Sequence, residues 1–135
     1  MQSKPVLTLD DCKKIAAACE AEAKSNNWPV VISIVDDGGH LIWLQRMDGA
    51  APISSHIAPA KAKTAALGRR ESKIYEDMIN NGRVSFLSAP LIEGMLEGGV
   101  PIVVEGQYVG AVGVSGVKSS EDAQIAKAGI AALGL

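Results

Sequence analysis

Aromatic side chains are scarce in this sequence: its 135 residues include only two Trp, two Tyr and one Phe. Nevertheless, 47% of the residues are apolar, so small aliphatic side chains and 14 glycines must fill the core. In such a core the backbones of neighbouring elements pack close together, which leaves some apolar surface available to neighbouring subunits. The length fits one domain, and we predict a single domain over residues 1–135.

The sequence also lacks an excess of positive charge and any long apolar run. Its formal net charge is −2, and no basic stripe with interleaved aromatics occurs, which argues against a nucleic-acid partner. Polar residues and turns interrupt every apolar run before it reaches the length of a membrane span. The first five residues contain no apolar signal core, so we expect a cytoplasmic protein without a membrane partner.

Cysteine is nearly absent, and the two that occur, Cys12 and Cys19, fall within one predicted helix. Seven residues of helix separate their Cα atoms by roughly 10 Å, whereas a disulfide tolerates no more than about 7 Å. No Cys-x-x-Cys or His-x-x-x-His spacing exists either. We therefore predict two reduced core thiols and no metal centre.

Two pairs of β-rich segments indicate hairpins. The first joins 30–35 to 41–47 through Asp36-Asp37-Gly38-Gly39, whose residues tolerate the positive φ angles of a tight turn. The second joins 100–104 to 108–114 through 105–107. Both faces of the first hairpin are largely apolar, with Ile32 and Ile34 on one side and Val31 and Val35 on the other. This pattern predicts a sheet with helices on both faces.

Four segments have the spacing or the caps of helices. They cover about 9–26 after an N-cap at Thr8, about 55–67 after Ser54 or Ser55 with an end at Gly68, about 73–80 after Ser72, and about 121–133. Strands joined by short turns must run antiparallel. The element order therefore predicts an α+β domain with an antiparallel sheet and not a doubly wound parallel one.

Glycines recur at positions 110, 113 and 116 in the last strand. This spacing differs from that of a dinucleotide-binding loop, which also needs a turn between a strand and a helix. Glycine inside a strand indicates bends or close approach of another backbone. Ser115 sits among these residues, but Val117 stands where a nucleophile elbow needs glycine. Ser115 is either a hydroxyl that satisfies turn backbone or a hydrogen-bond donor to a ligand.

Arg46 and Asp48 mark the exit of the first hairpin, where a strongly apolar strand ends in a charged turn. An arginine and a carboxylate at a strand exit can bind a small anion or another polar ligand. The same two residues can equally form a plain ion pair, which is common at protein surfaces. The sequence leaves both interpretations open.

His56 and Lys61 are the other candidates for chemistry. His56 lies in the first turn of a predicted helix, where it is either a haem ligand, a general base or a surface histidine. Lys61 and Lys63 lie among alanines and are either solvated or, for one of them, placed over the strand ends. A desolvated lysine there can bind an anion or form a Schiff base.

Five segments occur together in the order seen in one known family, namely 35–39, 46–50, 61–65, 98–101 and 110–116. On these segments the chain resembles the bacterial GlcG/HbpS-like family over nearly its whole length, with residues 66–71 and 80–83 closest to the GlcG branch. The resemblance implies a profilin-like three-layer α/β/α domain and a homo-oligomer, either a dimer or an assembly of dimers. It also implies a link to haem, which HbpS-type relatives and a domain fused to corrinoid adenosyltransferases bind, and to glycolate utilisation.

Three functions are compatible with these observations. The first is a small-molecule-binding protein whose ligand, haem or a small organic anion, lies near Arg46, Asp48, His56, Lys61 and Ser115. The second is an enzyme that acts on a small carbonyl, imine or hydroxy acid, with Lys61 or His56 as base or nucleophile and Arg46 holding a carboxylate. The third is a non-catalytic accessory of a metabolic enzyme.

Overall fold

Four antiparallel strands form one sheet with the order β2-β1-β4-β3, as the computed structural model of all 135 residues shows. The strands are β1 (Val31–Asp36), β2 (Leu41–Arg46), β3 (Gly99–Val104) and β4 (Gln107–Ser115). Each hairpin contributes one inner and one edge strand, so β1 and β4 pair at the centre. The predicted antiparallel α+β domain is confirmed.

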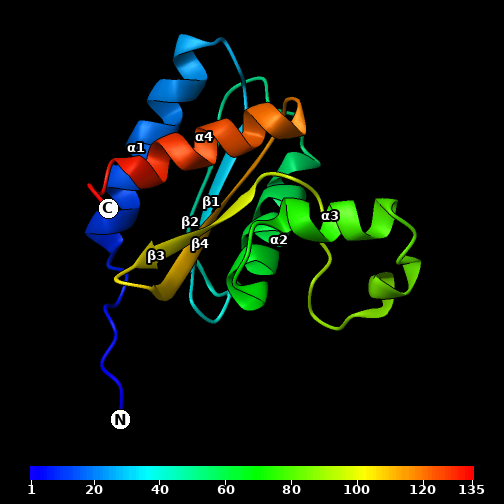
Figure 1. The fold of residues 1–135 in the computed structure, drawn as a ribbon. Coiled ribbons are helices and arrows are strands. Elements are labelled where there is room, and N and C mark those ends of the chain that lie inside the picture. Colours follow the sequence, from blue (N-terminus) through cyan, green and yellow to red (C-terminus); the bar gives the residue numbers. More distant parts are fainter.

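Helices cover both faces of this sheet (Figure 1). On one face α1 (Leu9–Ser25) and α4 (Ser119–Ala131) pack together, and on the other α2 (Ser54–Gly68) crosses β1 and β4. A short helix, α3 (Ser72–Asn80), and a 3₁₀ turn at Val84–Ser88 extend to the side of α2. The three-layer α/β/α arrangement is therefore present, and none of its helices is long and apolar enough to cross a membrane.

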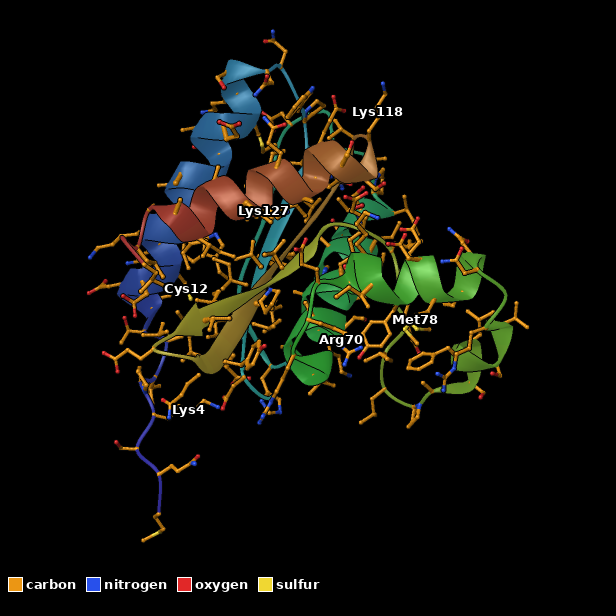
Figure 2. All side chains as sticks on the ribbon, in the orientation of Figure 1. Lys4, Cys12, Arg70, Met78, Lys118 and Lys127 are labelled. Carbon is orange, nitrogen blue, oxygen red and sulfur yellow. The ribbon has the colours of Figure 1, made fainter.

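The start of α1 follows directly from its sequence. The Thr8 hydroxyl accepts a hydrogen bond from the Asp11 backbone N–H, and the Asp11 carboxylate accepts one from the Thr8 N–H. Cys12, near the start of this helix (Figure 2), and Cys19 are fully buried free thiols, as predicted. Burial raises the pKa of Cys12 to about 11 and that of Cys19 to about 12.

Glycines allow the layers to approach closely, which confirms the interpretation of the glycine-rich strand. A Cβ atom at Gly113 of β4 would clash with the Ala58 carbonyl oxygen of α2. On the other face, a Cβ atom at Gly129 of α4 would clash with the Cys19 sulfur of α1. Both helix contacts therefore depend on a missing side chain, which is why this core needs few aromatic residues.

A buried ion pair joins the layers at one end of the sheet. The Lys61 Nζ of α2 lies 3.0 Å from the Asp122 Oδ2 of α4 and 3.0 Å from the Val114 carbonyl oxygen of β4. The two side chains are only 4% and 2% exposed. Burial raises the pKa of the Asp122 carboxyl, and the Lys61 ammonium opposes that shift. One lysine thus connects the layer above the sheet, the sheet and the layer below.

The serine caps predicted for the middle helices are wrong, because their hydroxyls make long-range contacts instead. Ser54 is the first residue of α2, and its Oγ accepts a hydrogen bond from Ser115 at 3.2 Å. Ser72 likewise opens α3, and its Oγ accepts a hydrogen bond from the Gly99 N–H at 2.8 Å. Gly68 also stays helical, since Arg69 adopts the left-handed conformation that ends α2.

We predict that Lys61→Met destabilises the protein by about 3–5 kcal/mol, because it leaves the Asp122 carboxyl buried without a counter-charge. The double variant Lys61→Met/Asp122→Leu should recover a large part of this loss. Urea denaturation at neutral pH measures both. Lys63→Met, two residues away at a half-exposed position, is the control and should cost less than about 1 kcal/mol. A Lys61→Met variant as stable as this control would contradict the structural role of the pair.

The α1 cap should give a pH-dependent contribution to stability. Hydrogen bonds from the Thr8 N–H and hydroxyl lower the pKa of Asp11 below its ordinary value. The Asp11 carboxylate therefore contributes fully to the free energy of unfolding above about pH 4, and this contribution is lost as the pH falls through the lowered pKa of Asp11. At neutral pH we expect Asp11→Asn to cost about 0.5 kcal/mol, since the site is exposed. Thermal unfolding at neutral pH and near pH 2 tests this, with Asp10→Asn as control; an equal cost at both pH values would refute it.

Candidate functional site

Three strands meet at the end of the sheet where β2 and β4 finish and β1 begins. In the register of the sheet Arg46 is paired with Val31, and Val31 is paired with Ser115. Paired residues point to the same face, and Val31 packs against Ala58 of α2. Arg46 and Ser115 therefore lie on the α2 side of the sheet, with their Cα atoms about 10 Å apart across two strand spacings.

The first turn of α2 covers part of this row. Ser115 is buried beneath it, and its hydroxyl is hydrogen-bonded to Ser54. His56, two residues further along the helix, is exposed, and its imidazole makes no hydrogen bond to another residue, whereas its backbone N–H donates to the Ile53 carbonyl oxygen. The sequence thus placed a hydroxyl and an imidazole at the same end of the domain, but only the imidazole is accessible.

Arg46 and Asp48 line a hollow of about 360 Å³ together with Glu20, Lys24 and Met47. A second hollow of about 270 Å³ shares Lys24, Met47 and Asp48 and continues to Trp28 and Pro29. Arg46 donates through Nε to the Ala50 carbonyl oxygen at 3.2 Å and makes no ion pair with Asp48. The alternative of a plain Arg46–Asp48 ion pair is therefore not realised.

Residues of α1 complete the charge distribution around this hollow. Lys24 lies 3.5 Å from Glu20, and Glu20 also accepts a hydrogen bond from Gln45 of β2. Sequence reasoning missed these two α1 residues, because their spacing is that of any solvent-exposed helix pair. Only the packing of α1 against β2 brings them beside Arg46.

Lys61 is separated from the hollow, since its ammonium is hydrogen-bonded at the end of β4 and Lys61 lines neither hollow at the exit of β2. Its partner Asp122 was also missed from the sequence. A signal was present, because Asp122 precedes Ile125, Ala126 and Gly129 at helical spacing and thus occupies the buried face of α4. A carboxylate on such a face indicates a buried partner.

The remaining donors do not form a metal site. No three His, Cys, Asp or Glu side chains gather closely enough to hold an ion. The other histidine, His40, lies at the β1–β2 turn with its Nδ1 atom 3.1 Å from the Asp36 carboxylate. His56 is therefore the histidine whose ring is free to bind a ligand.

Comparison with known proteins places the domain in a family. The family model described as haem degrading protein HbpS-like matches residues 7–131. The chain is 56% identical to protein GlcG of Escherichia coli K12 over 115 residues, which cover 85% of each chain. The residues matched by the family model include α1, the sheet and α2, and with them the candidate residues.

Two solved structures share the fold at lower identity. The crystal structure of a PduOC:haem complex is 30% identical, with a TM-score of 0.83 and 95% coverage of both chains. A double mutant of HbpS from Streptomyces reticuli is 29% identical, with a TM-score of 0.90 and coverage of 100% of this chain and 92% of that one. The match to the family model and the identity to GlcG agree with these structures, and the chain belongs to the HbpS-like family.

Proposed function

We propose that this protein is a small-molecule-binding protein whose ligand is haem. The observation that carries the proposal is its similarity to the PduOC:haem complex, which extends over 95% of both chains. The identity to GlcG supports a role connected with glycolate utilisation.

His56 is the residue that we propose as the iron ligand. Haem iron is commonly held by a histidine, and the imidazole of His56 is exposed and unpaired. Ile53, one helical turn earlier, has 60% of its surface exposed and would provide an apolar contact for the porphyrin. The first turn of α2 therefore offers haem an iron ligand, His56, and an apolar contact, Ile53.

A haem on this surface would have only one face covered by a single chain. Neither hollow at the exit of β2, of about 360 and 270 Å³, is lined by His56 or Ile53, so neither would enclose a haem bound to His56. We therefore propose a homo-oligomer in which a second copy covers the other face. Leu41 and Leu44, 53% and 44% exposed on the α2 side of the edge strand β2, support this arrangement.

The catalytic alternative has weaker support. A lysine nucleophile needs access to substrate and a neutral amine, whereas Lys61 is buried between a carboxylate and a carbonyl oxygen. Ser115 needs an adjacent base, and its hydroxyl is bonded only to that of Ser54. Neither residue has the surroundings of an activated nucleophile.

Titration with haemin tests the proposed ligand. We expect saturable binding with a Soret band shifted from that of free haemin, and at least tenfold weaker binding by His56→Ala because the iron loses its axial ligand. His40→Ala is the matched control and should bind as the wild type does. A stable Soret band over time indicates binding, whereas a steady loss of the band indicates degradation.

Two results would count against this proposal. Absence of saturable haemin binding would remove haem as the ligand. Equal affinity of His56→Ala and the wild type would keep haem but reject His56 as its ligand.

The oligomer is tested separately from the ligand. The chain has a mass of 14.0 kDa, so light scattering after size exclusion should give a multiple of this value. Leu44→Glu should shift the protein towards the monomer, because it places a charge in the proposed apolar contact. Leu87→Glu, on the 3₁₀ turn and 64% exposed, is the control that should leave the mass unchanged. A monomeric wild type would exclude this arrangement.

A further inference from the structure

The hollow at the exit of β2 contains two opposite charges that stay apart. Arg46 uses only its Nε for a protein contact, so both terminal guanidinium nitrogens are free. Asp48 makes no hydrogen bond or ion pair, although it lies two residues from Arg46 and lines the same hollow. Arg46 and Asp48 thus line the same hollow without pairing with each other.

The other charges of the hollow neutralise each other. Lys24 lies 3.5 Å from Glu20, and Gln45 donates a hydrogen bond to the other carboxylate oxygen of Glu20. This leaves Arg46 and Asp48 as the unpaired cation and anion among the residues that line the hollow. A ligand that suits the hollow must therefore present an anionic group to Arg46 and a hydrogen-bond donor to Asp48.

The spacing limits the size of such a ligand. β2 ends at Arg46 and Asp48 lies in the turn that follows, so the Cα atoms of these two residues are at most about 7 Å apart. A guanidinium with two free nitrogens matches a carboxylate in a bidentate manner. The donor group must then lie within a bond or two of the carboxylate to reach Asp48.

We infer that the hollow lined by Lys24, Arg46 and Asp48 binds a small carboxylic acid that carries a hydroxyl or ammonium group on the carbon next to its carboxylate. Arg46 holds the carboxylate, and Asp48 accepts the hydrogen bond from the neighbouring group. This site is separate from the proposed haem surface, because it depends on β2 and α1 and not on His56.

A matched ligand series tests this inference. Glycine, glycolate and acetate differ only in the group on the second carbon, which is ammonium, hydroxyl or hydrogen. Titration of each into ¹⁵N-labelled protein follows the Arg46 side-chain Nε–H and the Asp48 amide by NMR. We expect saturable shifts with glycine or glycolate, with an affinity about fivefold higher than for acetate, as suits an exposed charged contact.

Three variants assign the contacts. Arg46→Gln should abolish binding of all three ligands, and Asp48→Asn should bring glycine and glycolate to the affinity of acetate. Arg83→Gln, an exposed arginine on the 3₁₀ side of the molecule, is the control and should bind as the wild type does. A preference for glycine identifies a 2-amino acid, and a preference for glycolate identifies a 2-hydroxy acid; either supports the inference.

The inference is overturned if no ligand gives a saturable shift, if acetate binds as tightly as the other two, or if Arg46→Gln binds unchanged. Haemin titration of the Asp48→Asn variant distinguishes a failure of this inference from a failure of the proposed haem binding. Haemin binding equal to that of the wild type is expected, because Asp48 has no part in holding the haem.

Discussion

The buried ion pair between Lys61 and Asp122 fixes how the two helical layers lie on the sheet. Its ammonium is bound by the α4 carboxylate and by the last backbone carbonyl before Ser115. The backbone of Gly98 packs close to this ammonium, since a Cβ atom at position 98 would lie only 2.8 Å from the Lys61 Nζ. A charge buried this deeply is tolerated only when its partners are in place, so α2, β4 and α4 must reach their positions together.

That constraint determines where the candidate residues lie. Because Lys61 anchors α2 over the end of β4, the first turn of the helix covers Ser115 and presents His56 to solvent. The same strand row continues to Arg46 at the end of β2. The small residues of the core bring these elements close but cover the edge strand poorly, which leaves apolar side chains exposed beside the polar ones. The proposed binding surface therefore lies next to an uncovered apolar face.

Much of the fold could be predicted from local sequence, because the relevant interactions are local. Thr8 and Asp11 are three residues apart, and the turn at 36–39 needs only its own glycines and aspartates. The roles of Ser54 and Ser72 were mistaken, because hydroxyls that could cap a helix were used by Ser115 and Gly99 far along the chain. No local pattern distinguishes these two uses of a serine.

The candidate site was predictable to a similar extent. The grouping of Arg46 and Asp48 at a strand exit was visible in the sequence, whereas their failure to pair depends on the Ala50 carbonyl and on the α1 residues beside them. Lys61 and Lys63 could not be told apart, since both lie among alanines. Asp122 and Gly98 decide which of the two is buried, and only the tertiary structure brings them to Lys61.

Lys61 holds the layers together and is too deeply buried to react with a substrate. Acetylation of the native protein with limiting acetic anhydride, followed by mass spectrometry of its peptides, tests this burial. The structure predicts that Lys63 and Lys118 are acetylated while Lys61 stays unmodified until the protein is denatured. Modification of Lys61 in the native protein as fast as that of Lys63 would contradict the account and would instead indicate an accessible, reactive amine.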